Sequence, residues 1–275
     1  MLSMRRVVAA AVFACAAAGF SATTQAASCG NGPAGFPAWL QDFKQEAARA
    51  GISQRVIDSA LSGVSYQSKV IRLDRGQHSF KLSFDEFYRK RVNDAMIRKG
   101  HKLIGQYSSL LSSIEKRTGV PPEVIVSIWG LETGYGRNSG SMATFPSLAT
   151  LAYDCRRSAF FTGELLAALK IVQRGDIAPA QMRGAWAGEL GQTQFLASSY
   201  LRFAVDGDGN GRRDLINSVP DVLASTANYL RAYGWQPGQG WEPGTTNYNV
   251  LHQWNKADVY VKTISVMASK MAGRS

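Results

Sequence analysis

Glu132 stands where its neighbours in the sequence can turn it into a proton donor. It shares one face of a predicted helix with three apolar residues that come three, four and seven positions before it: Trp129, Ile128 and Ile125. Removing a carboxylate from water raises its pKa, and the negative end of a helix, here before Gly134, raises it further. A glutamate that keeps its proton at neutral pH suits general acid catalysis. The alternative is a helix-end glutamate that turns into solvent.

Residues 186–195, Trp-Ala-Gly-Glu-Leu-Gly-Gln-Thr-Gln-Phe, form a second segment suited to a ligand. Its glycines permit close approach of the backbone. Gln192 and Gln194 offer amide groups that match sugar hydroxyl and acetamido groups, and Trp186 and Phe195 offer flat apolar surfaces. A tight turn between helices with aromatic residues in the core explains the same pattern.

Residues 206–214 fit the start of a calcium loop. The template D-x-[DN]-x-[DN]-G is matched at its first, third, fifth and sixth positions, and the predicted ligands are Asp206, Asp208, Asn210, the Arg212 carbonyl and Asp214. Asn217 stands at position twelve in place of the usual bidentate glutamate, so we expect a weak, structural Ca²⁺ site. A surface turn rich in Asp and Asn, without metal, is the alternative.

Residues 254–260, Trp-Asn-Lys-Ala-Asp-Val-Tyr, form a fourth candidate. Asn255 and Tyr260 at this spacing are compatible with a sugar-binding cleft. On the residues alone, an ordinary helix start capped by Asn255 explains the segment better.

The elements that must position these segments are mostly helices. Apolar residues at helical spacing predict helices over 36–48, 53–61, 83–105, 103–117, from 121–122 onward, 162–174 and 220–233. Strand-like alternation is scarce, and residues 235–244, rich in Gly and Pro, predict a loop. The fold class is therefore mainly α, with functional loops between helices.

The N-terminal residues predict export. Arg5 and Arg6 precede an apolar run, 7–20, that is too short to span a bilayer easily, and a stretch of small and polar residues follows. We interpret 1–27 as a cleaved signal peptide and expect the mature chain, 28–275, in the periplasm without a transmembrane anchor. An uncleaved anchor, or a lipoprotein acylated at Cys15 or Cys29, is the alternative, although neither cysteine follows a good lipobox.

Export changes the interpretation of cysteines and charge. Loss of Cys15 leaves Cys29 and Cys155, which predict one disulfide in an oxidising compartment; two free thiols or a lipid on Cys29 are the alternatives. The formal charge of +11 favours a polyanionic partner. For an exported protein the cell wall fits better than nucleic acid, and we expect no nucleic-acid binding.

Taken in this order, the segments resemble the lytic murein transglycosylase B family, from residue 36 to residue 260. The most specific parts are Glu-Thr-Gly-Tyr-Gly at 132–136, Phe-Pro-Ser-Leu-Ala-Thr-Leu-Ala at 145–152, the 186–195 segment and Ala-Val-Asp at 204–206. The resemblance implies a lysozyme-like helical domain with a glycan cleft, a minor β component and an EF-hand-like calcium loop. It also implies cleavage of the β-1,4 bond between N-acetylmuramic acid and N-acetylglucosamine, with formation of a 1,6-anhydro ring.

The same resemblance assigns roles to individual residues. Glu132 would be the single catalytic carboxyl group, first an acid and then a base, so the chemistry needs no cofactor. Gln194, Tyr229, Asn255 and Tyr260 match positions that line the family's cleft, and residues 206–214 match its metal loop. Peptidoglycan strands are the expected partner, and we expect a monomer. The chain ends at Ser275, so we expect no C-terminal peptidoglycan-binding module.

Three positions depart from the family pattern. Ala185 replaces a common Ser, Ala197 a common Pro, and Glu189 a small residue. Glu189 matters most, because a hydrolase that retains configuration needs a second carboxyl group about 5 Å from the first. A muramidase is therefore one alternative to the transglycosylase, and a wall-binding scaffold without catalysis is the other.

Overall fold

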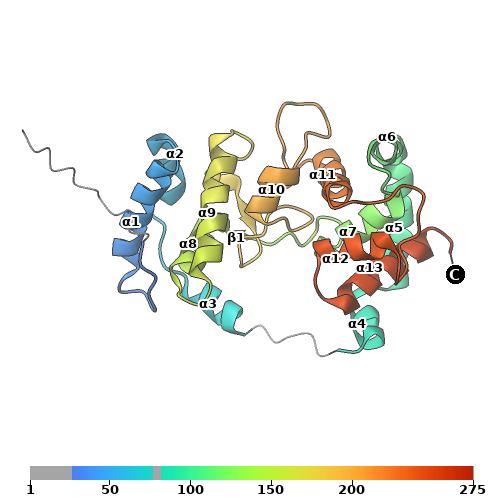
Figure 1. Ribbon diagram of the computed structural model, residues 1–275, viewed down its shortest axis with the longest axis horizontal. Helices are drawn as coiled ribbons and strands as arrows, with labels where there is room; N and C mark the ends of the chain where they lie inside the picture. Colours follow the sequence, from blue (N-terminus) through green and yellow to red (C-terminus); the bar gives the residue numbers. More distant parts are fainter. Residues whose placement is uncertain (1–26, 77–81, 275) are drawn as a thin grey trace, which may run out of the picture.

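The computed structural model describes residues 27–76 and 82–274, which are mainly helical (Figure 1). The helices are α1 (Phe36–Arg49), α2 (Gln54–Leu61), α3 (Ser68–Arg75), α4 (Phe84–Arg91), α5 (Asp94–Gln106), α6 (Ser108–Thr118), α7 (Pro122–Thr133), α8 (Thr144–Tyr153), α9 (Ser158–Gln173), α10 (Ala197–Phe203), α11 (Val219–Ala232), α12 (Thr246–Trp254) and α13 (Asp258–Met271), with a 3₁₀ turn at Pro179–Gln181. Strands β1 (Met142–Ala143) and β2 (Arg183–Gly184) pair antiparallel. The mainly α fold class is confirmed. Nearly all of the expected signal peptide lies outside the described residues.

Two groups of helices lie at opposite ends of the molecule (Figure 1). Helices α1 and α2 pack with α8 and α9 at one end, and α4, α5 and α7 pack with α13 at the other, where α6 packs against α5 and α7. Helices α10 and α11 lie between the two groups and contact α9 and α7, respectively. One continuous apolar core runs through both groups. No helix among the described residues is long and apolar enough to cross a membrane.

The single long helix predicted over 83–105 is wrong, because the chain leaves helical geometry at Val92. Val92 and Asn93 are extended, and the Asn93 side chain accepts a hydrogen bond from the Met96 backbone N–H at 2.9 Å. An asparagine in this position caps a new helix. Helix α4 has its own start, a capping box between Ser83 and Glu86. Capping residues therefore decide where α4 ends and α5 begins.

The expectation that Asn255 caps the start of a helix is also wrong. Asn255 follows α12 as the C-cap residue, and its side chain accepts a hydrogen bond from the Ala257 N–H at 2.9 Å in the turn before α13. The predicted loop over 235–244 contains no helix or strand.

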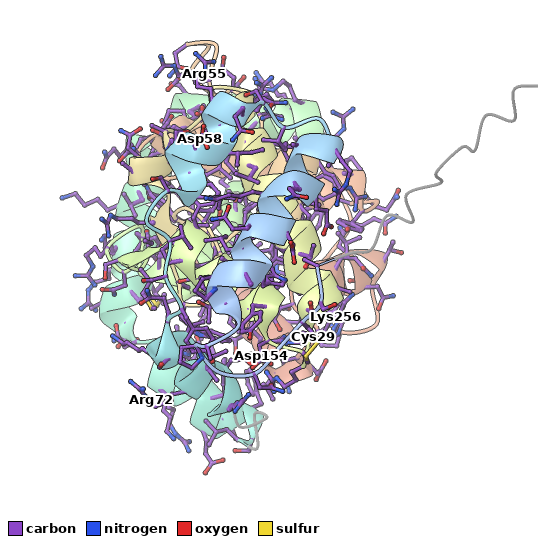
Figure 2. The ribbon with its side chains drawn as sticks, turned by 90° about the vertical axis from the view of Figure 1, so that its left-hand side faces the viewer. Cys29, Arg55, Asp58, Arg72, Asp154 and Lys256 are labelled. Atoms are coloured by element: carbon purple, nitrogen blue, oxygen red, sulfur yellow. A yellow bond between two sulfur atoms is a disulfide. The ribbon has the colours of Figure 1, made fainter. Side chains whose placement is uncertain are left out.

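The predicted disulfide between Cys29 and Cys155 is confirmed, with a Cα–Cα distance of 5.0 Å. It joins the residues before α1 to the turn that follows α8, and the Gly30 N–H donates to the Tyr153 carbonyl beside it at 2.9 Å. Figure 2 shows Cys29 next to Asp154, on the side of the molecule that carries α1 and α2. The bridge closes a loop across 126 positions of sequence.

Replacing both cysteines by serine should lower the free energy of unfolding by about 2–4 kcal/mol, because an open chain has more unfolded conformations to lose. Urea unfolding of the double variant beside the wild type measures this. We expect a lower midpoint, with a slope at least as steep as that of the wild type because the open chain exposes more surface when it unfolds. Equal midpoints would show that the bridge does not hold the folded protein together.

Candidate active site

Helix α7 ends one residue after Glu132, at Thr133. Pro122 starts the helix, where its missing N–H costs nothing, and Gly134 ends it with a left-handed φ of 61°. Tyr135 also adopts a positive φ of 63°, which costs energy for any residue other than glycine. Its hydroxyl donates to the Met96 carbonyl at 2.7 Å and its ring packs against Trp129. These contacts hold the turn that follows α7, in whose last turn Glu132 lies.

The side chain of Glu132 lines a cleft of about 440 Å³. Burial is the largest influence on its carboxyl group and raises the pKa to about 7. The Trp254 indole opposes this by donating from Nε1 to Glu132 Oε1 at 2.8 Å. The buried hydroxyl of Tyr260 and the Arg91 guanidinium also lower this pKa, while Glu189 raises it. The carboxyl group is therefore poised to lose or gain a proton near neutral pH.

Trp254 is held in place by two aromatic rings. Its ring centroid lies 5.4 Å from that of Phe195 and 4.9 Å from that of Tyr229, both at steep angles. The Tyr229 hydroxyl donates to the Gln253 carbonyl at 2.6 Å, immediately before Trp254. Tyr229 thus lines the cleft, and it is its ring that packs against the indole.

Gln192 connects the glycine-rich segment to the helix that bears Glu132. Its Oε1 accepts from Trp129 Nε1 at 2.9 Å, and its backbone carbonyl accepts from the Thr133 hydroxyl at 2.6 Å. Gly136, at φ 80°, lies so close that any side chain there would collide with the Gln192 amide. Gln192 is buried and is not among the residues that line the cleft. It therefore links the 186–195 segment to α7, about 60 positions earlier in the sequence, and the expectation that its amide binds a sugar is wrong.

The other residues expected in the cleft divide into two groups. Gln194 and Asn255 line it, as Tyr229 does. Gln194 adopts φ 54° and donates from Nε2 to the Ser139 and Gly191 carbonyls. Tyr260 is buried in α13 and is not among the residues that line the cleft; its hydroxyl faces Glu132 without a standard hydrogen bond to any described residue.

A second carboxyl group, that of Glu189, lines the same cleft. Burial is again the largest influence and raises its pKa, and Glu164 raises it further, while two backbone N–H groups and Arg157 lower it. One of its oxygens, Oε2, is buried without a hydrogen-bond partner among the described residues. Glu189, which replaces a small residue of the family pattern, therefore lies inside the candidate site.

Three carboxylates from the 206–214 loop and the start of α11 come together. Oxygens of Asp206, Asp208 and Asp221 all lie within 4.8 Å of one another. Asp221 belongs to the first turn of α11, and it also accepts hydrogen bonds from the Gly207 and Asp214 N–H groups. Carboxylate oxygens in this number suit a hard cation such as Ca²⁺.

The remaining predicted ligands make other contacts. The Asp214 carboxylate accepts hydrogen bonds from Asn217 and the Ile216 N–H, and Asn210 Oδ1 accepts from the Arg212 N–H. Neither Asp214 nor Asn210 belongs to the cluster of three carboxylates, and their roles as ligands, with that of the Arg212 carbonyl, stay predictions.

Sequence reasoning did not single out Trp254 as the partner of Glu132 or Asp221 as the third carboxylate of the cluster. Trp254 is the first residue of the 254–260 segment, so the sequence marked this region as a candidate, but nothing in it indicated that the indole contacts Glu132. Asp221 follows Ser218 by three positions at a helix start, where the Ser218 hydroxyl accepts from the Asp221 N–H at 3.3 Å. That spacing indicates a helix cap and carries no signal for a metal.

Residues 35–246 match the protein family described as the transglycosylase SLT domain. The chain is also 37% identical over 169 residues to the membrane-bound lytic murein transglycosylase B of Escherichia coli K12. That match covers 58% of this chain and 46% of the E. coli protein, so the chain spans about half the length of this relative.

Solved structures share the fold. SltB3 from Pseudomonas aeruginosa, in complex with NAG-anhNAM-pentapeptide, superposes with a TM-score of 0.82 at 30% identity, over 86% of this chain and 80% of that one. The Escherichia coli lytic transglycosylase SLT35, in complex with calcium, has a TM-score of 0.76 at 24% identity, over 90% of this chain and 97% of that one.

Proposed function

Because this chain belongs to the transglycosylase SLT domain family, we propose that it is a lytic transglycosylase of peptidoglycan. It cleaves the β-1,4 bond between N-acetylmuramic acid and N-acetylglucosamine and leaves a 1,6-anhydromuramic acid end. The observation that carries the proposal is the carboxyl group of Glu132, with a pKa of about 7, in a cleft lined by amide and aromatic side chains.

In the first step, protonated Glu132 gives its proton to the glycosidic oxygen, and the bond from that oxygen to C1 of the muramic acid breaks. The N-acetylglucosamine leaves with a new hydroxyl group. The acetamido group of the substrate stabilises the positive charge that develops at C1. On the protein side, the Trp254 N–H stabilises the carboxylate that Glu132 has become.

In the second step, the Glu132 carboxylate takes the proton from the C6 hydroxyl of the same muramic acid, and that oxygen bonds to C1. The ring closes, Glu132 regains its proton, and no water is consumed. One carboxyl group is sufficient because the substrate supplies the nucleophile.

Glu189 supports one alternative, a muramidase that uses two carboxyl groups, because it lines the same cleft. Digestion of purified sacculi followed by mass spectrometry separates the two reactions. Anhydromuramic ends support the transglycosylase, and reducing muramic ends support the hydrolase. A protein that binds sacculi without releasing any fragment would instead be a scaffold.

We further propose that Asp206, Asp208 and Asp221 hold a structural Ca²⁺ ion that ties the 206–214 loop to α11. The donor set fits, since all three are hard oxygen ligands, and the solved SLT35 structure is a calcium complex. The ion would take no part in the reaction. It would offset the repulsion of three carboxylates held close together.

Calcium in large excess should raise the melting temperature by about 5 °C or more over the protein in EDTA, because a ligand bound only by the folded state stabilises it by about 2.7 kcal/mol at a hundred times its Kd. Differential scanning calorimetry measures the shift. Asp208→Asn, which alters an exposed carboxylate, should abolish most of it. Identical melting in calcium and EDTA would contradict the site.

We propose that the enzyme acts on the cell wall in the periplasm, as a monomer, after removal of residues 1–27. The positive charge of the chain supports attraction to an anionic wall.

A further inference from the structure

The second carboxyl group of the cleft has no part in the proposed reaction. Glu189 and Glu132 both line the cleft, and no Lys, Arg or His is among the described residues that do so. This is the reverse of the chain as a whole, which has 31 Lys and Arg against 20 Asp and Glu. The cleft is therefore a local acidic region of a positively charged protein, and it favours a cationic group over an anionic one.

The backbone fixes where Glu189 stands. Its carbonyl accepts a hydrogen bond from the Ala185 N–H at 3.2 Å, and the next residue, Leu190, exchanges backbone hydrogen bonds of 2.7 and 2.8 Å with Phe195. The Phe195 ring packs against Trp254, whose indole binds the catalytic carboxyl group. One short segment thus positions both the second carboxyl group of the cleft and the hydrogen-bond partner of the first.

Glu189 has no counter-ion among the residues that the structure describes. It belongs to no ion pair in that part of the chain, and its Oε2 is buried there without a hydrogen-bond partner. Arg157 lowers the pKa of Glu189, but its guanidinium is paired with Asp74 and lies over the Phe161 ring. Burying a carboxylate without a partner costs energy that a donor on a ligand returns.

A cation returns more of this energy than a neutral donor does. A hydrogen bond between an ammonium and a carboxylate is about twice as strong as one between two neutral groups. The hydroxyl and acetamido N–H groups of sugars are neutral donors, and they offset the burial of a carboxylate only in part. An ammonium that belongs to the ligand is therefore the group that best matches Glu189.

The chemistry of the glycan strand limits where that ammonium can come from. Its sugars carry hydroxyl, acetamido and lactyl groups, none of them cationic, but loss of an acetyl group turns an acetamido group into an ammonium. On the muramic acid at the cleavage site, this loss would remove the acetamido group that stabilises C1 in the proposed first step. The ammonium must therefore belong to a glucosamine, the sugar that flanks this muramic acid along the strand.

We propose that Glu189 binds the ammonium of a glucosamine beside the cleavage site, so that the enzyme prefers glycan strands whose glucosamine residues have lost their acetyl groups. This inference rests on the proposed transglycosylase function and names a substrate class for it. Glu189 is then a residue that determines specificity by contact with the sugar, while Glu132 still performs both proton transfers.

The test compares two forms of one peptidoglycan: fully N-acetylated strands, and the same strands treated with a deacetylase that acts on N-acetylglucosamine residues. We expect wild-type kcat/KM to be about tenfold higher on the deacetylated form, because a charge-assisted contact replaces a neutral one. Treatment of both forms with acetic anhydride, which restores the acetyl groups, should make their rates equal. The amines of the peptide stems are the same in both forms before this treatment, so they cannot cause the difference.

Two variants, Glu189→Gln and Glu189→Ala, should each lower this ratio to about one, the first by removing the charge and the second by removing the whole group. The matched control, Asp58→Asn, removes the same charge from an exposed position on α2, outside the cleft (Figures 1 and 2), and should keep the wild-type ratio.

Two results would overturn the inference and leave the transglycosylase intact. One is wild-type cleavage of the acetylated form at an equal or higher rate, which would mean that Glu189 meets a neutral group or none. The other is a tenfold ratio that persists in both Glu189 variants, since another group would then recognise the ammonium. Release of no anhydromuropeptide from either form would overturn the proposed function as well.

Discussion

Replacing Glu132 by Gln should lower the rate of anhydromuropeptide release by about 10³-fold, within the range for loss of a general acid or base. Glutamine keeps the shape of the side chain and its contact with Trp254, but it can neither donate a proton to the glycosidic oxygen nor accept one from the C6 hydroxyl. Both steps are lost together, because one group performs both. The measurement is mass spectrometry of sacculus digests over time.

The fold should survive this substitution. Burial raises the pKa of Glu132 above its value in the unfolded chain, so the stability it contributes is present at acidic pH and is lost as the pH rises through about 7. At pH 8, a neutral glutamine is therefore no worse for folding than the native glutamate. A urea midpoint at or above that of the wild type is the control.

Glu189→Gln is the matched comparison within the same cleft. If the enzyme is a transglycosylase, this variant should lose far less activity than Glu132→Gln, and the products should keep their anhydro ends. A loss of comparable size, together with reducing ends from the wild type, would identify a two-carboxyl hydrolase and contradict the proposed mechanism.

The main features around Glu132 could be predicted from the sequence because they depend on nearby residues. The helix of α7, its proline start, its glycine end and the apolar face beneath Glu132 all follow from residues 121–136. The rise in the pKa of Glu132 followed from that face, and burial is indeed its largest cause. The family could also be recognised, since four motifs in a fixed order leave few alternatives, and the match over residues 35–246 confirms it.

What escaped the sequence depends on contacts between distant elements. The indole that binds Glu132 lies 122 positions away, and only the packing of α12 beside α11, with Tyr229 and Phe195 around the ring, brings it there. Asp221 comes fifteen positions after Asp206, beyond the twelve-residue template, and α11 returns it to the loop. The split between α4 and α5 was readable in principle, since Asn93 is a preferred cap, but the apolar periodicity ran across it.

The dependence of the reaction rate on pH should report the pKa of Glu132, which burial raises and the Trp254 hydrogen bond lowers. The first step needs the protonated form, so kcat/KM should be level below about pH 6 and fall about tenfold per pH unit well above the pKa of about 7. Trp254→Phe should move that fall to higher pH, because the lost N–H stabilised the carboxylate and thereby lowered the pKa.

The same substitution should lower the rate on the level part of the profile by about 10- to 100-fold, since a hydrogen bond to a charged group contributes about 1.5–3 kcal/mol. Trp254 acts here by stabilising the charge that Glu132 acquires when it releases its proton, which makes it a stronger acid. Tyr229→Phe is the control, because it removes only the hydroxyl that donates to the Gln253 carbonyl and keeps the ring against the indole. The kcat/KM of Tyr229→Phe should fall at nearly the same pH as that of the wild type. A Trp254→Phe profile that falls at a lower pH than the wild type would mean that the indole favours the protonated acid, and the role assigned to it would be wrong.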